Sequence, residues 1–398
     1  GGWVPTPQTQ DLLAEEIMIP AALAAQLQQG LADFLRVSFW SSTPGMGSVI
    51  EDLIAEPGAL AKGPYLSVKL PFASGSNPRY FPDVPLRFTP HAHQEQAFER
   101  LGGRRKLSTL VATGTGSGKT ECFLQPILDH CRGEADVPGV KAILVYPLNA
   151  LATDQAERLA KEIWNNDKLR GRVTAGLYIG GSQKKGKSSG FSEMGPSHLV
   201  TDRKVMQQSP PHILLTNYKM LDYLLLRARD RGVWQHNQRG TLRFLVVDEL
   251  HTFDGAQGTD LACLIRRLKR RLHADDGALC CVGTSATLGG PQAATELRRY
   301  AGEVFGEPFD PHSVVGESRV SAKQFLSDAE VVYRDEPDIE DIADLDPAAA
   351  GDADVWLQAQ IRLWLGEDTE MSDDANGRVE LGERLRRHAA FQAMVELL

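Results

Sequence analysis

The sequence predicts an α/β fold in which a central parallel sheet is covered by helices on both faces. Short apolar runs alternate with helical patterns along the middle of the chain, which is typical of parallel strands joined by helices. A glycine-rich turn follows the first run, and polar motifs follow most of the others. Ligands gather at the carboxyl edge of such a sheet, so these motifs are the candidate site. The predicted strands are 107–112, 142–146, 175–179, 212–216, 244–247 and 278–282.

The glycine-rich turn has the composition of a phosphate-binding loop. Residues 112–120 read ATGTGSGKT, between a predicted strand and a predicted helix. Glycines let backbone N–H groups turn toward anionic oxygens, and the helix adds its positive N-terminal end. Lys119 would contact the β- and γ-phosphates of ATP, and the Thr120 hydroxyl would bind Mg²⁺. The other predicted cofactor contacts are loop residues Thr115, Gly116, Ser117 and Gly118.

One position departs from the strict pattern of such loops. The pattern has a glycine six residues before Lys119, where this chain has Thr113. The departure leaves Gly116, Gly118 and the two residues after them intact. The alternative interpretation is a glycine-rich turn that binds nothing.

Gln94 lies on a predicted helix shortly before the phosphate loop. Its amide can pair a donor and an acceptor with the edge of adenine, which would select ATP by its base. A glutamine on a helix is more often a surface residue, but the place of Gln94 before the loop favours the base-contacting role.

An acidic pair follows the fifth predicted strand. Asp248 is predicted to hold Mg²⁺, and Glu249 to orient and deprotonate the attacking water. After the sixth strand, Ser285 and Thr287 carry hydroxyls that can hydrogen-bond His251. These residues would couple the nucleotide site to the other face of the lobe.

Composition and charge set further limits. The chain has 398 residues, of which 42% are hydrophobic, and a net charge of -9. Residues 328–376 contribute about -14, so the rest of the chain is mildly basic at about +5. No apolar run reaches the roughly 18 residues of a membrane span. The five cysteines show no C-x-x-C spacing, which favours free thiols in a cytoplasmic protein without a membrane partner.

The chain is predicted to have three parts. Residues 1–87 form a mainly helical accessory region, residues 88–318 the nucleotide-binding lobe, and residues 319–398 an acidic linker with a helical accessory segment. Two basic stretches stay open: the loop 182–190 and the helix 261–272. Each is either a solvated surface or a contact for nucleic acid, and the helix could also face a partner.

In order and spacing, these motifs resemble the first RecA-like lobe of the superfamily 2 DExH-box helicases. Gln94 resembles the adenine-reading glutamine of that family, residues 113–120 resemble motif I, and residues 248–251 resemble motif II. Leu250 stands where the commoner box has alanine. The run DGAQG at 254–258, before the arginine-rich helix, resembles the MrfA/YprA-like helicases, a branch that includes anti-phage helicases such as DISARM DrmA.

The resemblance implies a motor that uses ATP and Mg²⁺ to move along DNA, in phage defence or DNA repair, with other subunits of such a complex as further partners. It implies catalytic roles for Glu249, Asp248, Lys119 and His251, and coupling through residues 285–287. Single- or double-stranded DNA would be held by its phosphates, with little sequence preference. The implied nucleic-acid contacts are Pro147, Asn149, Gly180, Gly181, Thr216 and Asn217.

Two other functions stay open at this point. A nucleotide-dependent DNA-binding switch or loading module would bind DNA without separating its strands. A small-molecule kinase would share the phosphate loop, but it predicts neither the upstream glutamine nor the serine–alanine–threonine run after the acidic pair.

A second motor lobe is not recognisable, so we expect these residues to be an excerpt of a longer chain. Nothing after residue 290 resembles the Q-x-x-G-R-x-x-R motif that supplies an arginine to ATP hydrolysis. Such an arginine is typically worth roughly 10³ or more in rate. We therefore predict that the purified chain binds ATP but hydrolyses it slowly or not at all. Robust turnover stimulated by nucleic acid in an ATPase assay would contradict this.

Overall fold

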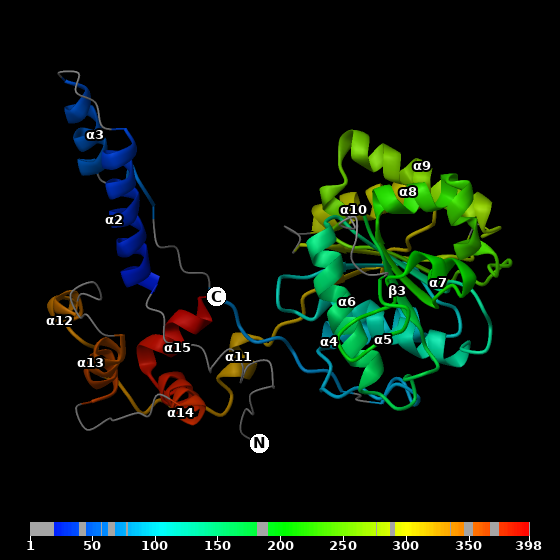
Figure 1. Cartoon of the computed structure of the whole chain (residues 1–398). Helices are drawn as coiled ribbons and strands as arrows, with labels where there is room; N and C mark the ends of the chain where they lie inside the picture. Colours follow the sequence, from blue (N-terminus) through cyan, green and yellow to red (C-terminus); the bar gives the residue numbers. More distant parts are fainter. Residues whose placement is uncertain are drawn as a thin grey trace. The chain divides into compact units, whose positions relative to one another are not determined.

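The computed structural model divides the chain into two compact units, each described by itself. One unit comprises residues 1–71 and 320–398, and the other comprises residues 72–319 (Figure 1). Within the described part, no helix is long and apolar enough to cross a membrane. The structure describes residues 20–39, 45–56, 58–62, 68–76, 79–180, 190–275, 277–286, 291–334, 336–345, 353–366 and 374–397.

The unit 72–319 is built around a seven-stranded sheet in which all neighbouring strands are parallel, in the order β3-β4-β2-β5-β6-β1-β7. The carboxyl ends of parallel strands meet at one edge, so the loops that follow them can form a common site. The strands are β1 (Thr109–Ala112), β2 (Ala142–Tyr146), β3 (Ala175–Tyr178), β4 (Ile213–Asn217), β5 (Phe244–Val247), β6 (Cys280–Ser285) and β7 (Val314–Gly316).

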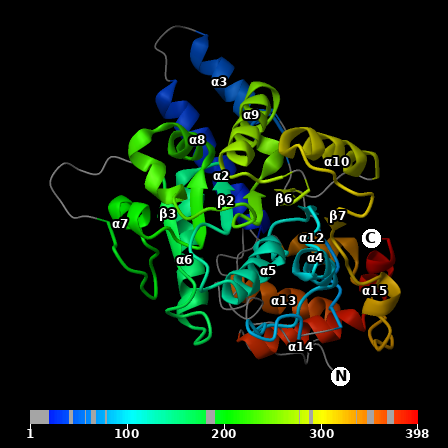
Figure 2. The same cartoon turned by 90° about the vertical axis from the view of Figure 1, so that its right-hand side faces the viewer.

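Helices cover both faces of this sheet, as predicted. Three lie on one face: α4 (Ala92–Gly102), α5 (Lys119–Gly133) and α6 (Asn149–Trp164). On the other face lie α8 (Tyr218–Leu226), α9 (Gly255–Arg271) and α10 (Pro291–Phe305), and both views show the two groups apart (Figures 1 and 2). Shorter elements complete the unit: α7 (Arg203–Gln208), η1 (Ala228–Trp234) and η2 (Leu250–Thr252).

Strand β2 shows why both faces are covered. Ala142, Leu144 and Tyr146 belong to the core cluster shared with α4, α5 and α6. Ile143 and Val145 belong to the cluster shared with α8, α9 and α10. Successive side chains on a strand point to opposite faces, so a strand buried on both faces is apolar throughout. This is the pattern that made the strand recognisable in the sequence.

The six predicted strands are confirmed, with two corrections. The last of them runs from Cys280 to Ser285 rather than over 278–282, because Thr284 and Ser285 are buried and pair in register with β1. Strand β7 was not predicted. It has three residues and ends in a glycine, so it carries no periodic signal, yet it pairs with β1 at the edge of the sheet.

The other unit is mainly helical where it is described. Helical accessory segments were predicted at both ends of the chain, as two separate parts, 1–87 and 319–398. Arg36 of α2 pairs with Glu51 of α3, with Nε 3.0 Å from Oε1. The helices of this unit are α2 (Pro20–Ser38), α3 (Met46–Ala55), α11 (Ala322–Phe325), α12 (Ile339–Asp344), α13 (Ala353–Leu365), α14 (Ala375–Arg386) and α15 (Ala389–Glu396).

The buried His212 and the partly buried His130 make the stability of the unit 72–319 depend on pH. Burial, with Lys141 as a further cause, lowers the pKa of His212 to about 4. Burial, with the nearby charges of Lys106, Arg243 and Lys141, lowers the pKa of His130 to about 4. Nδ1 of His212 accepts the backbone N–H of Thr174 at 3.1 Å, a bond that requires this nitrogen to be unprotonated.

We predict that acidification from pH 7 to pH 5 lowers the free energy of unfolding. The unfolded histidines take up protons below about pH 6.5 while the folded ones do not, so stability falls as pH drops through this window. Between pH 7 and pH 5, each histidine should lower the free energy of unfolding by an amount on the order of 1–2 kcal/mol. Denaturant unfolding of the chain and of its His212→Asn variant, whose amide oxygen can replace Nδ1, measures the effect. An equal pH dependence in the variant would contradict the assignment to His212.

Candidate nucleotide site

The order of the strands brings the predicted nucleotide motifs together. Strand β6 pairs with β1 on one side and with β5 on the other. The phosphate loop follows β1 and the acidic pair follows β5, so both lie beside the end of β6. Residues separated by more than a hundred positions therefore meet at one edge of the sheet.

The phosphate loop is shaped by two glycines in the left-handed conformation. Gly116 has φ 77° and Gly118 has φ 74°, values that favour glycine. The backbone N–H groups of Thr115, Gly116, Ser117 and Gly118 have no acceptor among the described residues. Successive free N–H groups in such a turn form an anion-binding concavity, so this loop fits the phosphates of a nucleotide.

Side chains hold the same loop by its carbonyl groups and hydroxyls. Nε2 of His93 lies 2.8 Å from the Ser117 carbonyl oxygen, and Nε2 of Gln94 donates to the Gly118 carbonyl at 3.2 Å. The hydroxyls of Thr113 and Ser117 lie 2.7 Å apart and are both buried. These bonds fix the loop and leave its N–H groups available. Thr113 thus has a structural use at the position where the strict pattern has glycine.

Gln94 is buried between the helix start and the loop. It is 2% exposed, and its Oε1 accepts the backbone N–H of His91 at 2.8 Å. A Cβ atom at position 118 would lie only 2.3 Å from Nε2 of Gln94. Glycine at this position therefore lets the Gln94 side chain approach the phosphate loop. Each end of the amide makes one bond within the protein, and one N–H and one lone pair remain. Because Gln94 is almost fully buried, a contact with adenine would require its side chain to become accessible. The adenine-reading role of Gln94 stays a prediction.

Thr284 organises the acidic pair. Its hydroxyl donates to Oδ1 of Asp248 and accepts the backbone N–H of Glu249, at 2.9 Å for the second bond. Glu249 has φ 49°, a left-handed conformation that is uncommon for a residue with a side chain. Burial raises the pKa of Asp248, and the Thr284 hydroxyl opposes that rise. Thr284 was not predicted as a site residue, although it begins the run that contains Ser285.

Lys119 and His251 both contact Glu249. Nζ of Lys119 lies 3.4 Å from Glu249 Oε1 and 3.5 Å from the Ser285 carbonyl oxygen. Nδ1 of His251 lies 3.4 Å from Glu249 Oε2 and 3.3 Å from the Ser285 hydroxyl. The predicted link between a hydroxyl after the sixth strand and His251 is therefore present, through Ser285. Thr287, the other predicted hydroxyl, lies outside the described residues.

The donor set also fits Mg²⁺ as it is held beside nucleotides. Within the described ranges, no group of three or more His, Cys, Asp or Glu residues could hold a metal by itself. Mg²⁺ at phosphate sites is typically bound by one or two protein oxygens, with phosphates and water completing the shell. Thr120, the second residue of α5, and Asp248, after β5, could supply these two oxygens.

The predicted nucleic-acid contacts gather at the ends of β2, β3 and β4. Nδ2 of Asn149 donates to the Gly180 carbonyl at 2.8 Å, and Nδ2 of Asn217 donates to Asn149 Oδ1 at 2.5 Å. The Thr216 hydroxyl is buried and donates to the Tyr178 carbonyl at 2.6 Å, so it supports the turn from within. Pro147 directly follows β2, and Gly181 lies outside the described residues.

A carboxylate that sequence reasoning missed contacts the start of the phosphate loop. Glu317, just after β7, accepts the backbone N–H of Gly114 at 2.5 Å. Nε of Arg319 donates to the other oxygen of Glu317 at 2.8 Å, and the Arg319 guanidinium lies 4.1 Å from the ring centre of Phe72. No motif marks Glu317, and its link to the loop depends on the unpredicted strand β7.

Comparisons with known proteins cover the part of the chain that holds these residues. A family model described as DEAD/DEAH box helicase matches residues 91–295. The Druantia protein DruE of Escherichia coli is 29% identical, over 64% of this chain and 18% of its own length. The uncharacterized ATP-dependent helicase YprA of Bacillus subtilis is 31% identical, over 52% of this chain and 24% of its own length. The chain thus spans less than a third of the length of these relatives.

Two matches among solved structures have TM-scores below 0.5. The DUF1998 helicase MrfA bound to DNA is 19% identical with a TM-score of 0.46, over 79% of this chain and 44% of that chain. The helicase Lhr of Mycobacterium smegmatis bound to single-stranded DNA and AMP-PNP is 23% identical with a TM-score of 0.43, over 69% of this chain and 30% of that chain.

We predict that Thr284→Val weakens the binding of Mg²⁺ and ATP, because it removes the hydroxyl that joins Asp248 to the Glu249 backbone. The lost hydrogen bonds should also lower the free energy of unfolding by roughly 1–3 kcal/mol. Calorimetric titration and denaturant unfolding measure the two effects. Thr284→Ser keeps the hydroxyl and should retain most of the affinity. Unchanged affinity in Thr284→Val would remove Thr284 from the site.

Proposed function

We propose, because the chain belongs to the DEAD/DEAH box helicase family, that it is the ATP-binding lobe of an ATP-dependent DNA helicase or translocase. The observation that carries the proposal is a shared sheet edge. The free N–H groups of the phosphate loop and the acidic pair lie at the ends of β1 and β5, and hydrogen-bonded asparagines lie at the ends of β2 and β4. A nucleotide and a nucleic-acid strand could thus bind to adjacent loops of one lobe.

Lys119 and Glu249 would exchange partners when the nucleotide binds. ATP supplies the phosphoryl group for transfer to water, and Mg²⁺ neutralises its charge. Lys119 would turn from Glu249 toward the more highly charged phosphates, since charge-assisted bonds to phosphate are strong. Glu249 would then be free to orient a water molecule and accept its proton. Before the nucleotide binds, the ion pair keeps this base occupied, with Nζ and Oε1 3.4 Å apart.

Ser285 and His251 would couple the nucleotide site to the bound strand. His251 Nδ1 lies within 3.4 Å of both the Glu249 carboxylate and the Ser285 hydroxyl. A change in the charge or position of Glu249 would therefore be felt at the end of β6. Coupling would continue through Thr287, by the family resemblance.

DNA would be held by its phosphates at the ends of β2, β3 and β4. Asn149 and Asn217 present amide groups there, and these amides bond each other and the Gly180 carbonyl. We assign Thr216 a supporting role, because its hydroxyl is buried. Contacts to phosphates carry little sequence information, so preference among DNA sequences should be slight. DNA rather than RNA, phage defence or repair, and further subunits as partners rest on the resemblance to the MrfA/YprA-like branch.

Two substitutions test the nucleotide site. Lys119→Ala should weaken ATP binding at least tenfold, by about 1.4 kcal/mol or more. Glu249→Gln should keep ATP binding and lose turnover in the longer protein that contains this lobe. Matched controls are Lys161→Ala and Glu157→Gln, since these two residues form an exposed ion pair on α6 with Nζ and Oε1 2.8 Å apart. Full ATP hydrolysis in Glu249→Gln would remove that residue from the base role.

The same longer protein separates a motor from a nucleotide-dependent switch. A motor displaces the strand of a partial duplex in the presence of ATP, and Glu249→Gln should abolish that displacement. Nucleotide-dependent DNA binding without any strand displacement would contradict the motor and favour the switch.

A further inference from the structure

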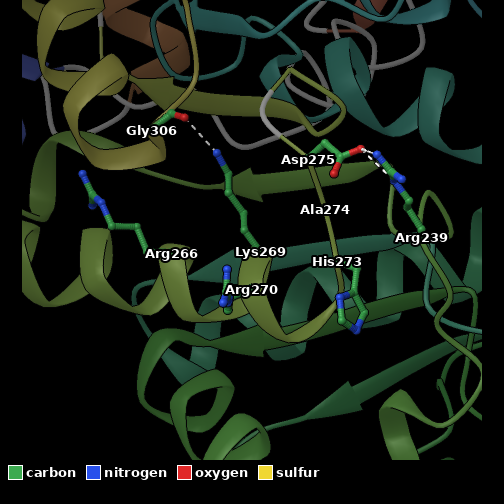
Figure 3. A pocket seen from close by; sticks show the side chains of 8 residues that line it. All are labelled: Arg239, Arg266, Lys269, Arg270, His273, Ala274, Asp275 and Gly306. Carbon is green, nitrogen blue, oxygen red and sulfur yellow. Dashed lines mark hydrogen bonds and ion pairs between the residues drawn. The ribbon is translucent and has the colours of Figure 1, made fainter.

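A basic pocket lies at the end of α9, at the sheet edge opposite the nucleotide site. Helix α9 begins after the acidic pair at the carboxyl edge and ends at Arg271, before β6 begins at Cys280. Since all strands are parallel, its end lies at the amino edge. The pocket there has a volume of about 1070 Å³. Its charged and polar lining consists of Arg239, Arg266, Lys269, Arg270, His273 and Asp275 (Figure 3).

Two of these cations are already neutralised. Lys269 is 8% exposed, its Nζ lies 2.6 Å from Glu307 Oε1, and it donates to the Gly306 carbonyl at 2.9 Å. Arg239 pairs with Asp275, as the dashed lines in Figure 3 show. These pairs build the wall of the pocket and leave its net charge to other residues.

Arg266 and Arg270 supply that remaining charge. Both are exposed, and neither has an acidic partner among the described residues. Arg266 donates only to a backbone carbonyl, that of Glu303, at 3.1 Å. The two arginines are spaced at i and i+4, which places them on one face of the helix. His273 lies beyond the end of α9, in a left-handed conformation with φ 51°. Arg267, next to this face, is instead paired with Asp222 at 2.8 Å.

Compensation of the helix dipole accounts for only part of this row. Basic residues in the last turn of a helix stabilise its negative end, and this explains Arg270. The effect fades within that turn. Arg266 lies five residues before the helix end, so the dipole does not explain its place in the pocket.

The lining indicates which kind of anion the pocket could hold. Among the described residues that line it, His273 carries the only aromatic ring and Ala274 the only apolar side chain. Stacking of bases and anchoring of apolar side chains therefore have no support here, although protein interfaces usually depend on apolar or aromatic anchors. Two neighbouring arginines without such anchors suit the phosphates of a nucleic-acid backbone, which are recognised by charge.

Other cations on the same edge add to the positive field. Lys106 precedes β1 and Arg243 precedes β5. Burial lowers the pKa of Lys106 and the charge of Arg243 lowers it further, while the carboxylates of Asp129 and Glu134 oppose this shift. Like charges gathered at one edge attract polyanions and speed their association.

We propose that Arg266 and Arg270 bind phosphates of a nucleic-acid backbone at a second site, on the edge of the lobe opposite the nucleotide. The inference rests on the proposed function, because it assumes that nucleic acid is the polymer on which the lobe acts. In a longer protein this site would bind a part of the nucleic acid other than the part held near Asn149 and Asn217.

The test compares Arg266→Gln/Arg270→Gln with a control of equal charge, Arg172→Gln/Arg231→Gln, whose arginines are exposed and lie outside the pocket. Fluorescence anisotropy measures the binding of labelled single- and double-stranded DNA over a range of salt concentrations. Loss of two phosphate contacts should lower affinity on the order of tenfold at low salt and reduce the salt slope by about 1 to 2. ATP binding should be unchanged in both variants.

Each outcome has one meaning. Weaker binding in the pocket variant alone supports the site, and the two DNA forms show whether it takes a single strand or a duplex. Equal binding by the pocket variant and the control overturns this inference and leaves the proposed function standing. If the unaltered chain binds neither DNA, both fail. If only a labelled polyglutamate peptide loses affinity in the pocket variant, the site serves an acidic protein and the inference is overturned.

Discussion

The pairing of β6 with both β1 and β5 is the constraint on which the site depends. Its register sets Ala112 opposite Ser285 and Val247 opposite Gly283, so the three strands end at nearly the same level. The phosphate loop, the acidic pair and the hydroxyls of β6 meet for that reason. Thr284 then fixes Asp248 and the Glu249 backbone from the central strand, and no loop has to be long to complete the site.

The sequence alone was sufficient to predict the elements whose apolar pattern matches their burial. Strands buried on both faces are apolar throughout, and this located six of the seven strands. The end of β6 was misjudged because Thr284 and Ser285 are polar yet buried, with their hydrogen bonds made inside the site. A prediction from periodicity assumes that polar residues are exposed. It therefore places the end of a strand wrongly where buried hydroxyls make hydrogen bonds inside the protein. Strand β7 failed for a different reason, since three residues carry no period.

The same limit applies to the candidate site. The phosphate loop and acidic pair were visible because their glycines and carboxylates are local in sequence. The bond from Glu317 to Gly114 joins residues about two hundred positions apart and follows from the sheet alone. Gln94 was found, but its burial against Gly118 was not foreseeable from its position on a helix. The distribution of charge was also not visible in the total. The chain has a net charge of -9, yet a basic pocket lies at the amino edge of the sheet.

Side chains hold the phosphate loop by its carbonyl groups, and we propose that this leaves the N–H groups of the loop for a triphosphate. Hydrogen–deuterium exchange with and without Mg²⁺ and a non-hydrolysable ATP analogue tests it directly. We expect slower exchange of the backbone N–H groups at 115–120 and 248–251, with little change at the end of α9. Unchanged exchange at 115–120 in the presence of saturating analogue would contradict it.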